Sequence, residues 1–359
     1  MKNLFSGDFP SSRVLTLMLL ATVGLIVATP FIFPGSRPID TAAKICVFIV
    51  LVASYDLMLG YTGIVSFAHT MFFAIGAYGV AIAVKNFGPS WGAVLLGSLA
   101  ALALTSVLAL LIGLFSLRVR ALFFAMITLA VSSAFALLAS QLRSVTGGED
   151  GITFSLPDPL RPSFRLFEGD FLGVAANGRL ITFYLIVIVT FLVFVALLRL
   201  VNSPFGRVLQ AIRENEFRTE AIGYPTLVYR TLANVIGALG ATVAGILLSL
   251  WLRYTGPNST LDLAIMIDIL LMTVIGGIGT MYGAVLGAAL FLLVQNYLNT
   301  LMASASKATE GIPILPNLLH PDRWLLWLGL LFILSVYFFP KGIVGRLRAA
   351  AIGRQKPGS

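Results

Sequence analysis

The sequence predicts an all-α polytopic membrane protein, and two observations carry that prediction. Of the 359 residues, 58% are hydrophobic and only 11% are charged, whereas about a quarter of the residues in soluble domains are charged. The hydrophobic residues gather in about ten runs, most of them near the length of about 20 residues that a helix needs to cross a bilayer. We therefore treat residues 1–359 as a single transmembrane domain.

The expected spans follow the chain with short connections, except at two polar segments, 143–179 and 199–230. The first run begins close to the N-terminus but is long for the apolar part of a secretion signal, and no small-x-small cleavage site follows it, so we expect it to be retained as a span. The ten expected spans are residues 14–33, 42–59, 63–84, 91–117, 122–142, 180–198, 231–252, 261–278, 281–302 and 324–339.

The charges predict which ends of the spans face the cytoplasm. The chain has 24 Lys and Arg against 15 Asp and Glu. These basic residues lie between apolar runs rather than on one soluble face, which argues against a nucleic acid partner. A cytoplasmic N-terminus places 14 of the 24 basic residues inside, as the positive-inside rule requires, and it groups four tryptophans at outer span ends: Trp91, Trp251, Trp324 and Trp327. We expect a cytoplasmic 199–230 segment, a basic cytoplasmic tail at 340–359 and an extracytoplasmic 143–179 loop.

Ten spans with a polar loop after the fifth are consistent with two halves of five. An odd number of spans in each half makes the halves inverted relative to one another, which is a common transporter plan. Each half also contains a glycine-rich break before a helix of small residues. We expect hinge or packing roles for the glycines of these breaks, namely Gly60, Gly63, Gly276, Gly277, Gly279 and Gly283.

Small residues recur every four positions in two of the expected spans. One series is Gly279, Gly283 and Gly287, and the other is Gly237, Ala241 and Gly245. This spacing lets helix backbones approach closely in lipid, so we favour packing inside the bundle over a role as the wall of a translocation path.

Ionisable residues inside apolar runs are functional candidates. Asp56, His69 and Asp268 fall within the second, third and eighth expected spans. Each either lines a translocation path or holds the structure by capping a broken helix or pairing with a neighbouring span, and we slightly favour the structural role.

The sequence gives no sign of a bound cofactor, metal or catalytic centre. Cys46 is the one cysteine and lies in an apolar run, and the two histidines, His69 and His320, are far apart. In the loop TGGEDGI, Glu149 and Asp150 are too few carboxylates for a calcium loop, so we expect a turn there. The chain contains no G-x-x-x-x-G-K-[ST], H-E-x-x-H, G-x-S-x-G or C-x-x-C motif. We expect it not to be an enzyme.

The longest polar, charge-dense segment, residues 203–230, carries clear helix signals. Ser203 is a helix N-cap and Pro204 a first helical residue. The spacing of Phe205, Val208, Leu209 and Ile212 gives one apolar helix face, with Arg207, Gln210 and Arg213 on the other. A second short helix is expected to end near Gly223, two residues before Pro225. The segment is therefore predicted to form one or two amphipathic helices between membrane spans.

This segment, SPFGRVLQAIRENEFRTEAIG, resembles the cytoplasmic coupling loop of ABC importer permeases, and in particular that of the M-type permeases for branched-chain amino acids. The resemblance continues in DLMLGYTGIVSFAHTMFFAIGAY, TGGEDGI, VIGGIGTMYGAVLGA and YFFPKGIVG, so it extends over nearly the whole chain. Ala68 departs from it, since many relatives have glycine there. The resemblance implies contacts with an ATPase by Arg213, Glu214, Glu216, Glu220, Ala221 and Gly223. It adds Phe72 and Phe73 to Asp56, His69 and Asp268 as translocation-path candidates.

The resemblance also implies the rest of a machine and a fold like that of type II importers. The partners would be a related second permease, two ATPase subunits that bind ATP and an extracytoplasmic solute-binding protein, and the location would be the bacterial inner membrane. The implied solute is a branched-chain or related hydrophobic amino acid, although importers of urea, amides and aromatic acids share this permease type. A different class stays open, namely a secondary transporter or channel that works alone with Asp56, His69 and Asp268 as an ion relay.

Overall fold

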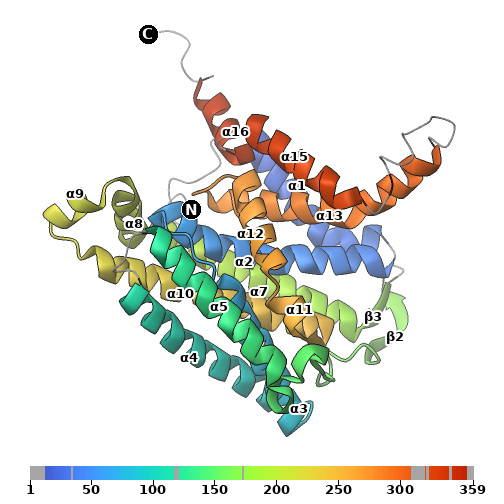
Figure 1. Ribbon diagram of the computed structural model, residues 1–359. Helices are drawn as coiled ribbons and strands as arrows, with labels where there is room; N and C mark the ends of the chain where they lie inside the picture. The colour runs from blue at the N-terminus through green and yellow to red at the C-terminus, as the bar shows by residue number, and fades with distance from the viewer. Residues whose placement is uncertain are drawn as a thin grey trace.

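The structure is a computed structural model that describes residues 13–33, 35–116, 121–171, 174–308, 320, 323–338 and 342–353. It is a bundle of long helices that run side by side (Figure 1). Nine helical segments among the described residues are long and apolar enough to cross a membrane. They are α1 (Arg13–Ile32), α2 (Ser36–Thr62), α3 (His69–Phe87), α4 (Trp91–Ser116), α5 (Ala121–Gln141), α7 (Gly178–Asn202), α10 (Thr226–Leu252), α11 with α12 (Pro257–Thr260 and Leu263–Gly276), and α13 (Met281–Ala308).

The tenth expected span corresponds to α15 (Trp324–Phe338), which has 15 residues as described. It is followed by α16 (Gly342–Gly353), which lies in the expected basic tail. The predicted all-α polytopic fold is thereby confirmed.

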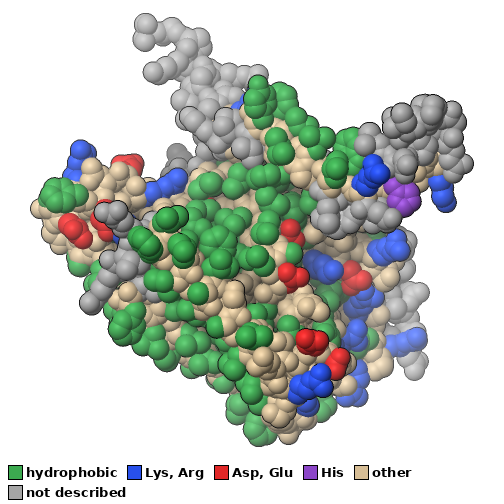
Figure 2. Space-filling model, viewed as in Figure 1, with side chains coloured by type: hydrophobic (Ala, Val, Ile, Leu, Met, Phe, Trp, Pro, Cys, Tyr) green, Lys and Arg blue, Asp and Glu red, His purple; other side chains and the backbone are tan. Residues whose placement is uncertain are grey.

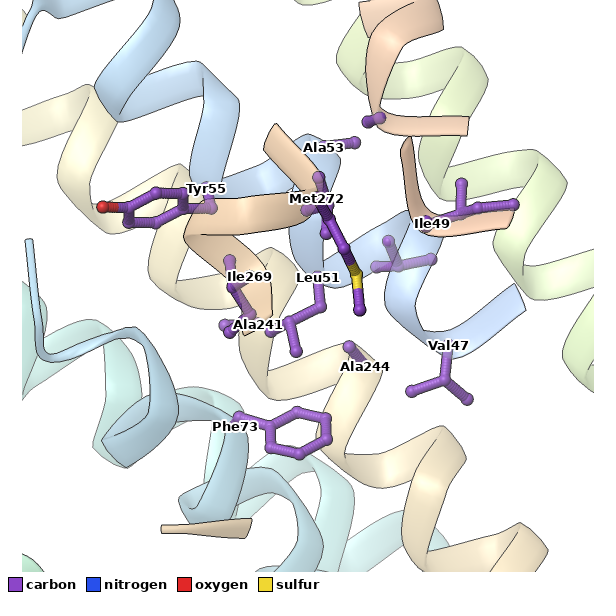
Figure 3. Close-up of a cluster of buried hydrophobic side chains, with 14 of the residues drawn as sticks. Val47, Ile49, Leu51, Ala53, Tyr55, Phe73, Ala241, Ala244, Ile269 and Met272 are labelled. Carbon is purple, nitrogen blue, oxygen red and sulfur yellow. The ribbon is translucent and has the colours of Figure 1, made fainter. Parts of the chain in front are cut away.

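Helices α2 and α10 form the centre of the bundle. They pack against each other, and α2 also contacts α7, α12 and α13 while α10 contacts α3 and α4. Figure 3 shows the side chains of α2 from Val47 to Tyr55 surrounded by Phe73 of α3, Ala241 and Ala244 of α10, and Ile269 and Met272 of α12. In contrast, α1, α4 and α5 expose many leucines, as expected for helices that face lipid rather than water.

Glycines permit the closest helix crossings, as the small-residue spacing predicts. A Cβ on Gly76 of α3 would lie 2.0 Å from the Thr242 carbonyl oxygen of α10, and one on Gly245 of α10 would lie 1.8 Å from the Phe73 carbonyl oxygen. Helices α12 and α13 meet in the same way, because a Cβ on Gly287 would lie 2.1 Å from the Met272 carbonyl oxygen. Such contacts leave no room for any side chain, so these glycines act in helix packing.

The helix contacts agree with a division into two halves of five. In such a division α2 corresponds to α10, α3 to α12 and α4 to α13. The contact between α3 and α4 then has its equivalent in the contact between α12 and α13. Likewise α10 packs on α3 and α4 of the first half, as α2 packs on α12 and α13 of the second. The two glycine-rich breaks, however, do not correspond, because one follows the second helix of its half and the other follows the third. In the second half, the equivalent of the Gly60–Gly63 break is the connection between α10 and α12.

Polar structure collects at the two ends of the bundle. The 143–179 segment forms α6 (Arg143–Thr146), the 3-10 turn η1 (Gly148–Asp150), β1 (Ile152–Thr153) and the hairpin of β2 (Arg165–Phe171) with β3 (Val174–Asn177). Strand β1 pairs with β4 (Tyr254–Thr255) beyond the end of α10. Gly147, Gly148 and Gly151 all have positive φ, which confirms the predicted turn.

The opposite end of the bundle carries α8 (Pro204–Glu214) and α9 (Glu216–Ala221). Figure 2 shows charged side chains at both ends and a mostly hydrophobic surface between them.

Several elements differ from the sequence-based expectation. The third span was expected from residue 63, but residues 63–68 are not helical, because Gly63 ends α2 in the left-handed conformation with φ 74°. Their backbone is held by neighbouring helices, for example through the Phe67 N–H that donates to Thr128 Oγ1 of α5 at 3.0 Å. Helix α10 begins at Thr226 rather than at residue 231, so the polar connection is shorter than 199–230. The strands and α16 were not expected.

Candidate coupling and translocation sites

The polar segment, which we define as residues 203–225, begins with the predicted amphipathic helix. Ser203 Oγ accepts from the Gly206 N–H and Pro204 is the first residue of α8. Leu209 and Ile212 are buried, whereas Arg207 and Gln210 are exposed. Helix α8 therefore lies with its apolar face against α2, α7 and α10, which confirms the predicted faces.

The second helix of the segment, α9, is defined by caps at both ends. Asn215 Oδ1 accepts from the Arg218 N–H at 2.9 Å at its start. At its end, the N–H of Gly223 donates to the Glu220 carbonyl oxygen at 2.9 Å and Gly223 has φ 96°. A left-handed residue at this place favours glycine, so the predicted stop at Gly223 is confirmed.

Arg213 joins the polar segment to two membrane helices. Its guanidinium donates to the Gly60 carbonyl oxygen near the end of α2, and its Nη1 is the nearest atom to a Cβ built on Gly279, at 2.8 Å. The Gly279 N–H in turn donates to Asp56 Oδ1 of α2 at 2.8 Å. We call Asp56, Gly60, Arg213 and Gly279 the junction. Both glycine-rich breaks of the sequence meet there.

The glycines of the junction are required by the closeness of the backbones. A Cβ on Gly60 would lie 2.4 Å from the Gly279 nitrogen and 2.2 Å from Asp56 Oδ1. Gly277 and Gly279 have φ of 118° and 78°, values that L side chains rarely adopt. Beside them, a Cβ on Gly342 of α16 would lie 2.2 Å from Gly277 Cα. The tail helix thus packs on the same turn.

Two predicted coupling residues, Glu216 and Glu220, contact this chain's own helix α10. Thr226 Oγ1 donates to Glu220 Oε1 at 2.5 Å and to Glu216 Oε1 at 3.3 Å. Glu216 also forms an ion pair with Arg230. Together with Arg213, these contacts fasten the polar segment to α2 at one side and to α10 at the other. Of the six predicted coupling residues, Glu214, Ala221 and Gly223 are exposed without such contacts among the described residues.

Sequence reasoning missed two exposed apolar residues of the polar segment. The side chain of Phe217 on α9 is 83% exposed and that of Ile222 is 67% exposed. They lie at an end of the bundle where charged side chains gather (Figure 2), and Glu214, Arg218 and Glu220 are close to them in the sequence. The signal available in the sequence was a phenylalanine within the charged run RENEFRTE, where a solvated linker has no need of one.

Four of the five translocation-path candidates are enclosed by this chain's own helices. Asp56, His69, Phe72 and Phe73 are each at most 1% exposed. His69 Nε2 is 3.0 Å from Ser54 Oγ, and since the Ser54 hydroxyl donates to the Leu51 carbonyl oxygen, His69 is the donor. Its ring also makes an edge contact with Tyr55. Phe72 offers its carbonyl oxygen to Thr242 Oγ1 at 3.2 Å.

Asp268 is the path candidate that reaches the surface. It is partly exposed on α12, and Gln295 Nε2 of α13 donates to its Oδ2 at 3.2 Å. Exposed apolar residues such as Ile267 and Leu293 lie on the same two helices, and the exposed Asp262 precedes α12. The sequence placed all five candidates in one class, whereas the structure separates Asp268 from the four enclosed residues.

A metal or cofactor site has no support in the described part of the chain. No group of three His, Cys, Asp or Glu side chains lies close enough there to hold a metal ion, and Cys46 is buried and free.

Comparison with known proteins decides the family. Residues 37–336 match the family described as "Branched-chain amino acid transport system / permease component". The chain belongs to this permease family. Like the other members, this permease is a non-enzymatic, multi-pass component of a transport system, and the resemblance seen in the sequence is confirmed.

The permease is similar to several curated proteins over most of its length. It is 26% identical to the high-affinity branched-chain amino acid transport system permease protein LivM of Salmonella typhimurium over 320 residues, or 85% of this chain and 74% of the relative. It is 30% identical to the probable LivM of Methanocaldococcus jannaschii over 218 residues, 60% and 58% of the two chains. It is 27% identical to BraD of Pseudomonas aeruginosa over 303 residues, 83% and 92% of the two chains. No solved structure matches the permease.

Proposed function

We propose that this permease forms half of the translocation path of an ATP-driven importer of branched-chain amino acids. It lies in the bacterial inner membrane with both termini in the cytoplasm. Its partners are a related second permease, two ATPase subunits that hydrolyse ATP and an extracytoplasmic solute-binding protein. One observation carries the coupling part of the proposal: the polar segment has an exposed apolar tip and is fastened to two central helices.

The apolar tip, formed by Phe217 and Ile222, is the surface that fits an ATPase. Exposed apolar residues inside a polar rim mark protein interfaces, and a large aromatic residue is a frequent anchor in such interfaces. A short helix that lays its apolar face in a groove is an established way for one protein to hold another. We expect Phe217 to enter a cleft of the ATPase while Glu214 and Arg218 form polar contacts around it.

The attachments of the polar segment make it a lever. Arg213 bonds to α2, and Glu216 and Glu220 bond to Thr226 and Arg230 of α10. Because α2 and α10 are the two central helices, a displacement of α8 and α9 reaches the middle of the bundle without passing through a flexible linker. The second permease would then move against this one to open the path alternately to each side.

The substrate assignment follows from the relatives, since three curated permeases are named for branched-chain amino acids. Asp268 is the best candidate for the path wall, because it is partly exposed and is the one charged residue of the otherwise apolar α12. Urea, amides and aromatic acids are the competing substrates. Uptake of radiolabelled leucine, urea, acetamide and benzoate by the complete importer separates them, and uptake of any of the other three without leucine would refute the proposal.

The decisive experiment replaces Phe217. Phe217→Asp should reduce recovery of the ATPase with the affinity-purified permease by about tenfold or more, since an anchor of this kind contributes about 2 kcal/mol or more. The matched control is Phe87→Asp, at the end of α3 and 67% exposed, which we expect to leave recovery unchanged. Equal recovery of the ATPase with both variants would remove the support for this docking surface.

A further inference from the structure

The end of the bundle opposite α8 and α9 holds a charged pocket that the coupling scheme does not use. It is a cavity of about 230 Å³ between the start of α2, the start of α7, the end of α10 and the 143–179 segment. We call it the outer pocket. Its lining includes Asp40, Leu160, Pro162, Arg179, Trp251 and Arg253. Pockets for drug-sized ligands begin at about 300 Å³, so the outer pocket suits a small solute.

One side of the outer pocket is a fixed acidic group. Asp40 Oδ1 accepts from Arg179 Nη2 at 2.7 Å and from Trp251 Nε1 at 3.1 Å. The Arg179 guanidinium also lies 5.4 Å above the Trp251 ring. All these contacts hold Oδ1, and Oδ2 of Asp40 has no hydrogen bond to any described residue. The side chain of Asp40 is 43% exposed, so Oδ2 is available to a cationic donor.

The other side of the outer pocket is formed by Arg253. The guanidinium of Arg253 makes no ion pair or hydrogen bond with the residues that the structure describes, although Asp40 lines the same cavity. Arg253 is also the one non-glycine residue among them with a positive φ, 55°. Glycine or asparagine is usual at such a helix end. Strained residues of this kind gather at functional sites.

We propose that the outer pocket binds the zwitterion of an α-amino acid. Arg253 receives the carboxylate, Oδ2 of Asp40 receives the ammonium group, and Leu160 and Pro162 contact an aliphatic side chain. The inference rests on the proposed function, which places this end outside the cell and names an aliphatic amino acid as the solute. The pocket would then be a site at which the solute meets the permease from outside.

The test measures binding to the full-length permease in lipid nanodiscs, without ATPase or binding protein, by saturation-transfer NMR titration. The probes are L-leucine, leucinamide, which has no carboxylate, and 4-methylpentanoate, which has no ammonium group. Each charge-assisted hydrogen bond contributes about 1.5 kcal/mol or more, so leucine should bind about tenfold more tightly than either analogue.

Two variants should act on different analogues. Arg253→Asn, which suits a left-handed residue, should weaken leucine and 4-methylpentanoate about tenfold and leave leucinamide unchanged. Asp40→Asn, which keeps an acceptor for Arg179 and Trp251, should weaken leucine and leucinamide and leave 4-methylpentanoate unchanged. Arg253→Lys should restore part of the leucine affinity. Arg161→Gln, an equal charge loss at a half-exposed residue that pairs with Asp158 in the same segment, should leave the affinity for all three probes unchanged.

Several outcomes would overturn the proposal. One is the absence of leucine binding to the wild-type protein at about 10 mM, far above the concentration that a weak site needs. Another is equal weakening of all three probes by Arg253→Asn. Displacement of leucine by inorganic phosphate but not by leucinamide would instead indicate a simple anion site. Leucine uptake by the complete wild-type importer is measured separately, so failure of the outer pocket and failure of the proposed function are distinguishable.

Discussion

The backbone N–H of Gly279 donates to Asp56 Oδ1 at 2.8 Å and so ties the turn between α12 and α13 to the last turns of α2. The two residues are 223 positions apart in the chain. Arg213 of α8 reaches the same place. Its guanidinium donates to the Gly60 carbonyl oxygen of α2 and lies beside Gly279 of the turn. Asp56, for which the sequence left a path role and a structural role open, is therefore part of a link between helices in the folded chain.

Gly60→Ala should destabilise the permease more than an ordinary helix substitution. The new Cβ would lie 2.4 Å from the Gly279 nitrogen and 2.6 Å from its Cα. These are backbone atoms, so they can move only if the turn between α12 and α13 is displaced. Overpacking of this kind costs about 1–3 kcal/mol. Thermal unfolding in detergent should show a clear fall in Tm.

The matched control for Gly60→Ala is Gly24→Ala in α1. No atom lies within 4 Å of a Cβ built on Gly24, and alanine is the better helix former. We expect an equal or higher Tm for this variant. A Tm for Gly60→Ala as high as that of Gly24→Ala would contradict the close contact in the junction.

Asp56→Asn should retain transport. The amide oxygen of asparagine can still accept from the Gly279 N–H, whereas the charge that an ion relay needs is gone. Asp56→Leu removes the acceptor and leaves the half-buried Gly279 N–H without this partner, at a cost of about 1 kcal/mol. Solute uptake and Tm should therefore fall in Asp56→Leu only. Loss of uptake in Asp56→Asn with an unchanged Tm would show that the charge itself is needed.

Arg213→Ala should separate coupling from docking. The ATPase should still be recovered with this variant, because Phe217 and Ile222 are intact, but solute uptake per ATP hydrolysed should fall. Removing one element of a coupling network changes the coupling by about 0.5–2 kcal/mol, which is roughly a 2- to 30-fold effect. The measurement is uptake and ATP hydrolysis by the complete importer in the same vesicles.

Arg207→Ala is the control for Arg213→Ala. Arg207 is exposed on the same helix, and its side chain makes no hydrogen bond or ion pair with the residues that the structure describes. Arg207→Ala removes one positive charge, as Arg213→Ala does. Any effect of net charge on the cytoplasmic face is therefore shared by the two variants. If Arg207→Ala uncouples as strongly as Arg213→Ala, the contact with Gly60 is not the cause.

Asp268→Asn should lower uptake without lowering stability. Asparagine keeps an oxygen for Gln295 Nε2, so the contact between α12 and α13 survives, while a charge on the exposed face is lost. We expect uptake to fall by about tenfold, the effect of one lost charge-assisted interaction. The Tm should be unchanged.

Asp262→Asn is the corresponding control on α12. Asp262 Oδ1 accepts from the Ala264 N–H at 2.9 Å as the cap of this helix, and asparagine caps a helix as well as aspartate does. The variant removes the same charge about two turns from Asp268. Normal uptake by Asp268→Asn, or an equal loss in Asp262→Asn, would exclude Asp268 as a specific part of the path.

Local patterns decided much of what the sequence could predict. Runs of apolar residues predicted the spans because a bilayer imposes their length, and Ser203, Pro204 and Gly223 marked the helix ends of the polar segment because backbone groups at helix ends have few partners. The apolar face of α8, with Leu209 and Ile212, was predicted for the same local reason. Errors occurred where a neighbour far along the chain decides, as at residues 63–68, whose backbone is satisfied by Thr128 of α5.

Only the tertiary structure brought the functional groups together. No spacing rule relates Asp56 to Gly279, Arg213 to Gly60 or Asp40 to Arg253, because these pairs arise from helix packing and not from periodicity. The same packing enclosed His69, Phe72 and Phe73 and left Asp268 and Phe217 at the surface. The sequence by itself determined the class of protein and the polar segment. The folded chain decided which of its residues form the junction, the apolar tip and the outer pocket, since close contact of α2, α10 and their neighbours sets those distances.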